Sequence, residues 1–129
     1  MKALFAAIET LFTGSALDTA LDGKLFLYEA PQDIDVPFAV YMMESDNSDY
    51  TFDSKSHEIS LVFFVESSEG NAVEVCDNLE LLEALFDDCK LAVSGYRFLR
   101  MERKDVQLVH EPGENWQYMA RYRILLEEE

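Results

Sequence analysis

The sequence predicts an α+β domain in which a mostly antiparallel sheet of about five strands carries two helices packed on one face. Two adjacent stretches lead to this prediction. Residues 57–66 (HEISLVFFVE) alternate with a period of two, which is typical of a β-strand. Residues 69–86 then carry apolar side chains at steps of three and four, the stripe of an amphipathic α-helix. These positions are Ile59, Leu61, Phe63 and Val65 in the strand, and Ala72, Val75, Cys76, Leu79, Leu82 and Phe86 in the helix.

Length and composition predict one domain spanning residues 1–129. A chain of 129 residues that is 49% apolar can bury a core without disulfides or metals. The net charge of −16 argues against a protein that binds nucleic acid or anionic lipid by itself. Residues 1–89 hold 3 basic and 19 acidic side chains, whereas residues 90–129 hold 7 of each. The excess is either a solvated acidic surface, or a face that meets a basic partner or the Arg-rich last third of another copy.

The two cysteines indicate a reduced, cytoplasmic protein. If Cys76 and Cys89 lie on one helix, the 13 residues between them span about 20 Å, too far for a disulfide.

The apolar residues near the start have helical spacing and are interrupted by Glu9, so they predict an amphipathic helix rather than a signal peptide. No apolar run approaches the ~20 residues of a membrane span.

The first third of the chain alternates helix-forming and strand-forming segments. Gly14 is a natural helix end, Asp22-Gly23 is a turn signal, and Pro37 can begin a strand but not occupy its middle. The expected elements are a helix at 2–12, a further helical turn at 16–21, a strand at 24–28, an extended connection at 29–36 and a strand at 38–43.

Residues 44–56 (ESDNSDYTFDSKS) are polar and acidic and have no stable period. They predict either a long hairpin loop or a ribbon with a short strand at 50–53. The helix that follows has an outer stripe of acids without a basic residue four positions on. Like charges at that spacing cost about 0.2–0.5 kcal/mol per pair, which favours a partner outside the chain. The stripe consists of Glu74, Asp77, Glu80, Glu83 and Asp87.

The last third predicts a hairpin. Residues 96–109 form one long or bulged strand, a turn at 111–115 contains Pro-Gly, residues 116–126 form the return strand, and 127–129 are a charged tail. Several strands place apolar side chains on both faces, but two helices cover only one face. The other face must therefore meet either another part of this chain or another copy, and we expect oligomerisation. The residues concerned are Tyr41, Met43, Val62, Phe64, Met119 and Leu125.

The sequence carries no pattern typical of a catalytic or metal site. His57 and His110 are expected at the surface, and the cysteines and histidines lack the close pairing of metal ligands. Asp46, Asp49 and Asp53 match a calcium loop in composition only, since the central glycine and the terminal glutamate are missing. Gly-rich phosphate loops and nucleophile elbows are also missing. We expect a protein that is not an enzyme and uses no cofactor.

Part of the chain resembles a known family. Gly23-Lys24, the short strand at 25–28, Ala30-Pro31 and Pro37-Phe38 resemble the pattern of the small tail-completion proteins of long-tailed phages and prophages, the tail-terminator or tail-to-head joining group. The family's central strand and helix are similar to 59–65 and 71–86, and its closing hairpin to 98–109 and 118–126. The acidic segment 44–56 is not demanded by the pattern.

The resemblance implies a structural protein that forms a ring, expected to be six-fold, at the end of the tail tube. Its partners would be other copies of itself, the tail-tube protein and the head connector, first in the host cytoplasm during assembly and then in the virion tail. DNA would pass through the ring without specific binding, because acidic side chains repel phosphates. We expect acids to face the lumen or the tube and arginines to join neighbouring copies. The acids are Asp46, Asp49 and Asp53, or the helix stripe from Glu74 and Asp77 onward; the arginines are Arg97, Arg100, Arg121 and Arg123.

Two other classes remain open from the residues alone. An acidic DNA mimic that inhibits a nucleic-acid enzyme would explain the net charge, but not the arginines after residue 96 or the second apolar face. A small dimeric ligand-binding domain would need a pocket with converging polar groups.

Overall fold

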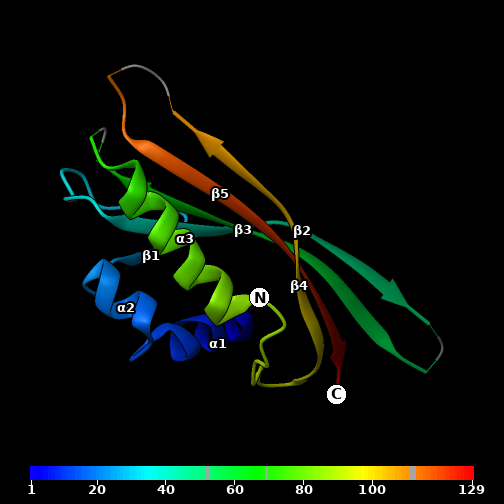
Figure 1. Cartoon of the computed structure of the whole chain (residues 1–129). Coiled ribbons are helices and arrows are strands. Elements are labelled where there is room, and N and C mark those ends of the chain that lie inside the picture. Colours follow the sequence, from blue (N-terminus) through cyan, green and yellow to red (C-terminus); the bar gives the residue numbers. More distant parts are fainter. Residues whose placement is uncertain (52, 69, 111–112) are drawn as a thin grey trace.

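The computed structural model describes residues 1–51, 53–68, 70–110 and 113–129. Within these ranges, three helices lie on one face of a single five-stranded sheet (Figure 1), so the predicted α+β class is confirmed. They are α1 (Lys2–Phe12), α2 (Ala16–Leu21) and α3 (Ala72–Phe86). The segment expected as a further turn forms α2, because Ser15 caps it by accepting a hydrogen bond from the Asp18 N–H. The third helix, α3, begins after Asn71, whose side chain accepts from the Glu74 N–H, and Glu69 lies outside the described residues.

The sheet has the strand order β1-β2-β3-β5-β4. β1 pairs with β2 in parallel, and every other neighbouring pair is antiparallel. None of the described helices is long and apolar enough to cross a membrane. The strands are β1 (Leu25–Leu27), β2 (Phe38–Tyr50), β3 (Lys55–Ser67), β4 (Tyr96–Val109) and β5 (Trp116–Glu128).

The acidic segment forms a ribbon of two strands. β2 continues seven residues beyond the predicted end at Met43. It pairs with β3 along its whole length, from Phe38 opposite Glu66 to Tyr50 opposite Lys55, and the register shifts once, between Met43 and Ser45. Of the alternative short strand at 50–53, Tyr50 belongs to β2, Thr51 and Asp53 lie outside the strands, and residue 52 lies outside the described residues. The Thr51 N–H donates to the Ser54 carbonyl over 2.8 Å. We call residues 44–50 and 55–58 the ribbon. It extends beyond the helices at one end of the sheet (Figure 1).

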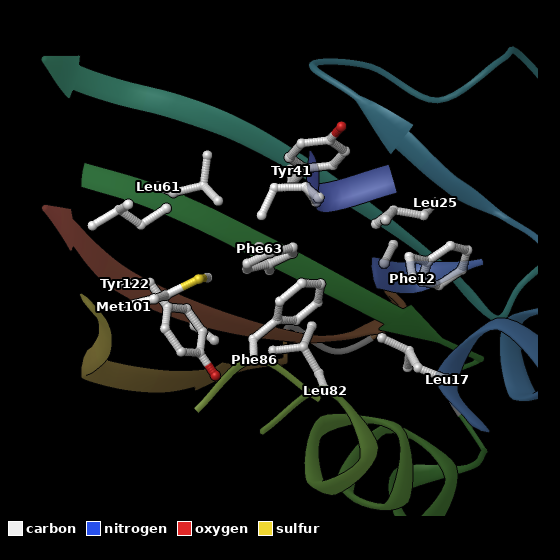
Figure 2. Packing of buried hydrophobic residues seen from close by; sticks show 14 of the residues in the cluster. Phe12, Leu17, Leu25, Tyr41, Leu61, Phe63, Leu82, Phe86, Met101 and Tyr122 are labelled. Atoms are coloured by element: carbon white, nitrogen blue, oxygen red, sulfur yellow. The ribbon is translucent and has the colours of Figure 1, made fainter. Parts of the chain in front are cut away.

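The core lies between the helices and the sheet and is centred on Phe63. Its ring stacks on Phe86 of α3 at 4.6 Å between centroids and meets the edge of Tyr122 at 5.7 Å (Figure 2). Tyr41 stacks on the opposite side at 5.7 Å. All four side chains are fully buried. Burying one such side chain contributes about 1.5–3 kcal/mol, so the predicted strand and helix do form the centre of the domain.

The face of the sheet opposite the helices is less apolar than we expected. Tyr41 and Met43 do not belong to it, because Tyr41 is a core residue and Met43 packs against the core. On β3, Val62 is only 1% exposed and Phe64 is half-buried. Since side chains alternate along a strand, this face also carries charged residues of β5. We call it the free face, with Val62, Phe64, Met119, Arg121 and Arg123 at its centre.

The closing hairpin agrees with the prediction except at its end. β4 spans residues 96–109 as expected, and its pairing with β5 shifts register twice, after Phe98 and after Arg103, as a bulged strand does. The predicted charged tail is wrong, because Glu127 and Glu128 continue β5. In the predicted turn at 111–115, residues 111–112 lie outside the described residues.

Candidate functional site

A network of ion pairs crosses the free face and is centred on Arg121 of β5. Its Nε lies 2.7 Å from Oε1 of Glu44, and its Nη1 lies 2.9 Å from Oδ2 of Asp105. Glu44 belongs to β2 and Asp105 to β4, so one guanidinium links the two outer parts of the sheet across β3. Ser60 of β3 also donates to Glu44 over 3.0 Å. The hydrogen bond from Arg121 holds the pKa of Glu44 below its usual value.

A second group of charges surrounds Glu102 of β4. Arg123 lies 2.7 Å from its Oε1, Lys104 3.2 Å and Arg100 4.0 Å. The Lys104 hydrogen bond is the largest of the contacts that lower the pKa of Glu102. Arg123 also lies 3.5 Å from Glu58 of β3. The free face is therefore tied together by alternating charges from several strands.

The four arginines expected to join copies all lie on this face, and each already has a carboxylate partner in its own chain. Arg97 binds Glu127 at 3.1 Å. The side chains of Arg97 and Arg100, on the edge strand, are 66% and 56% exposed, whereas those of Arg121 and Arg123 are about one-third exposed or less. The first two are thus accessible to a partner. A role of these residues between copies stays a prediction.

The expectation of a surface position for His57 is wrong, because the residue is only 6% exposed. Its Nδ1 lies 2.9 Å from Asp46 of β2, and its Nε2 lies 2.9 Å from Glu128 of β5. The rings of Tyr50 and Tyr96 meet it edge to face. Burial alone would lower the pKa of His57, but the two carboxylates outweigh burial and raise it. The charged imidazolium fits this site, since both nitrogens then donate to carboxylates.

The three acids of the ribbon do not converge. Asp46 faces His57, whereas Asp49 lies on the opposite face of β2 by strand alternation and is exposed, and Asp53 lies in the turn. Among the described residues, no group of three or more His, Cys, Asp or Glu side chains has an arrangement that could hold a metal ion. The ribbon therefore offers dispersed negative charge rather than a binding site for one ion.

The acidic stripe of α3 is partly neutralised within the chain. Arg103 of β4 binds both Glu83 and Asp87, and Asp87 also accepts a hydrogen bond of 2.6 Å from the Tyr122 hydroxyl. The argument that the whole stripe needs an outside partner is wrong for these two acids. The exposed part of the stripe is Asp77 and Glu80, and Glu74 is half-buried at the start of α3.

The hollows on the surface are open grooves. One, of about 370 Å³, lies between α1 and residues 90–94 and is lined mainly by small apolar side chains. Another, of about 530 Å³, lies beside the start of β4 and includes Cys89. Burial raises the pKa of the Cys89 thiol to about 11, so this sulfur is protonated at neutral pH and a poor nucleophile.

Comparison with known proteins finds similarity in structure and not in sequence. No protein-family model and no curated protein matches the chain. A chain from the virion of a native gene transfer agent particle superimposes with a TM-score of 0.80, covering 95% of this chain and 92% of that one, at 10% sequence identity. The two chains share a fold. At 10% identity the similarity shows the fold alone and does not transfer a role from one chain to the other.

The sequence interpretation missed the importance of His57 and Arg103, and also of the acids that pair with Arg121 and Arg123, namely Glu44, Asp105 and Glu102. His57 has the same strand parity as Ile59 and Leu61, and this was the available signal that it points to the helix side of the sheet. No local pattern indicated that Arg103 would bind the acids of α3, because those contacts depend on how β4 packs beside the helix.

Proposed function

We propose that this protein is a structural component of a phage-like particle, in which its copies form a ring that ends the tail tube and joins it to the head connector. The observation that carries the proposal is the match over nearly the full length of both chains to a chain of a gene transfer agent virion. The resemblance to tail-completion proteins supports the same proposal independently, because it rests on short sequence motifs and not on a superposition of structures.

The charges of the molecule suit a ring through which DNA moves. All five arginines have a carboxylate partner within the chain, so none contributes to a bare basic patch that would hold phosphates. The ribbon and the exposed side of α3 add negative charge that repels DNA. We infer that the ribbon acids, or the exposed acids of α3, face the lumen or the tail tube.

The proposal is tested by removing the gene from the genome that encodes this chain and imaging the particles by electron microscopy. We expect full heads and tail tubes that are not joined, with tubes of uncontrolled length, and normal particles when the gene is restored. Joined particles of normal length without the protein would contradict the proposal. A salt-sensitive complex of the purified chain with a DNA-binding enzyme would instead support the DNA-mimic alternative.

A further inference from the structure

We propose that copies of this chain join edge to edge, with the outer edge of β2 in one copy pairing antiparallel to the outer edge of β4 in the next. The inference rests on the proposed ring and names the surfaces that build it. The free edges of the sheet, their charges and the register of the strands support this contact.

The outer edge of β2 beyond Met43 has no neighbouring strand among the described residues, and the outer edge of β4 has none either, although one of its carbonyls is already bonded within the chain. The short strand β1 covers β2 only at Ala39–Tyr41, and among the described residues no strand lies beside 44–50 on that side. At the other end of the sheet, β5 is the one strand that pairs with β4 within the part of the chain that the structure describes. On its outer side the Met101 carbonyl accepts from the Asp88 N–H. An edge strand presents N–H and C=O groups that another strand can bind.

The two edges carry opposite charge. Residues 44–50 contain three acidic side chains and no basic one, whereas residues 96–104 contain four basic side chains and one acidic. Glu44, Asp46 and Arg103 are paired within the chain, so the charges presented to a neighbour are mainly those of Asp49 on β2 and of the well-exposed Arg97 and Arg100 on β4. Like charges directly opposite each other destabilise a strand pair, so pairing of β2 with β2, or of β4 with β4, is disfavoured. Pairing of β2 with β4 is favoured. Such a contact joins different surfaces of two copies, the head-to-tail type that closes into rings.

The strand register places residues 45–49 of β2 and residues 97–102 of β4 at the same position along the strand direction, on opposite edges of the sheet. Two rows of directly paired residues, which cross the sheet perpendicular to the strands, connect the acidic edge to the basic edge. The rows are Asp49, Ser56, Glu127 and Arg97, and Ser45, Ser60, Arg123 and Glu102. A rotation about an axis parallel to the strands therefore brings Asp49 of one copy level with Arg97 of the next.

The strand directions also match. Because β2, β3, β5 and β4 alternate in direction, β2 of the next copy runs antiparallel to β4 after that rotation. The side chains that would meet lie on one face, since Asp49, Arg97 and Arg100 all have the parity of the free face. The outermost arginines are also the most exposed of the predicted four.

The test uses two variants that each reverse one edge. In the first, Ser45→Lys, Asn47→Lys and Asp49→Lys make the β2 edge basic. In the second, Arg97→Glu and Arg100→Glu make the β4 edge acidic. A control with Lys2→Glu, Ala16→Glu and Thr19→Glu has the same charge change as the second variant, at exposed positions outside the sheet. Native mass spectrometry and sedimentation velocity, at chain concentrations up to about 1 mM, report the oligomers, so that contacts with a Kd as weak as about 1 mM are detected.

We expect oligomers from the wild type and from the control, and monomers from either edge variant alone. An equal mixture of the two variants should recover the oligomers. In the mixture, the edges of the first variant are both basic and those of the second are both acidic, so copies of the two variants can alternate. Recovery in the mixture also shows that each variant is folded. In the oligomer, amide hydrogen exchange should slow in residues 44–50 and 96–103, which the register places level with each other, and stay unchanged in α1.

Three results would overturn the edge-to-edge contact: a wild type that remains monomeric over the whole range, edge variants that assemble like the control, or a mixture that does not recover. None of them contradicts the ring at the tail end, which the gene-removal experiment tests separately. Conversely, unjoined particles in that experiment together with fully assembling edge variants would keep the proposed function and remove this contact.

Discussion

The helix-covered body and the ribbon are stabilised by different interactions. In the body, aromatic and aliphatic side chains from α1, α2 and α3 pack on the sheet, and the largest of them are fully buried. In the ribbon, residues 44–50 are all exposed, and the contacts that fix it are hydrogen bonds and ion pairs from Glu44, Asp46 and His57. The comparison predicts a body that is insensitive to salt and pH and a ribbon that is sensitive to both.

The largest effect is expected from emptying the core. Phe63→Ala should lower the free energy of unfolding by about 3–5 kcal/mol, because it removes the stacked contacts to Phe86 and Tyr41 and leaves a cavity. Urea denaturation followed by circular dichroism measures the loss. A loss below about 1 kcal/mol would show that Phe63 is not the centre of the body.

The His57 contacts should make the ribbon depend on pH. Since the folded pKa of His57 is raised above its unfolded value of about 6.5, the stabilisation is fully present below that value and is lost as the pH rises through the folded pKa. His57→Gln should cost about 1–3 kcal/mol at pH 6 and remove the pH dependence between pH 6 and 8. Denaturation at several pH values measures both. An unchanged pH profile in the variant would contradict this role.

Breaking the network on the free face should have a smaller effect. Arg121→Met should destabilise by about 1 kcal/mol in low salt, since Arg121 and its partners Glu44 and Asp105 are each about one-third exposed or more and therefore screened. The difference from the wild type should shrink in 1 M salt, where the Debye length is about 3 Å. An equal difference at both salt concentrations would point to lost packing instead of charge.

The smallest effect comes from a matched pair of acids in the ribbon. Asp49→Asn changes an exposed carboxylate and should alter stability by less than about 0.5 kcal/mol. Asp46→Asn weakens the contact to His57 and should cost about 1 kcal/mol more at pH 6. Thermal unfolding of the two variants side by side gives the difference, and equal losses would remove the distinction between the two faces of the ribbon.

The two regions also differ in how well the sequence predicts them. The bounds of α1 and β4 and the stripe of α3 follow from apolar periodicity, because burial on one side imposes a period on the residues. The ribbon could not be predicted in this way, since residues 44–50 are exposed on both faces and burial imposes no apolar period on them. The contacts of His57 could not be predicted either, because its partners lie 11 and 71 residues away in the sequence and only the strand register brings them together.

The central claim is that copies of this chain assemble into a ring at the end of a tail. Cryo-electron microscopy of the particles encoded by the same genome, at a resolution that traces the chain, tests this claim most directly. We expect one closed ring of this fold between the tail tube and the head connector, with the ribbon of each copy beside β4 of the next. Particles whose tail-to-head junction is built entirely from other chains would contradict the account.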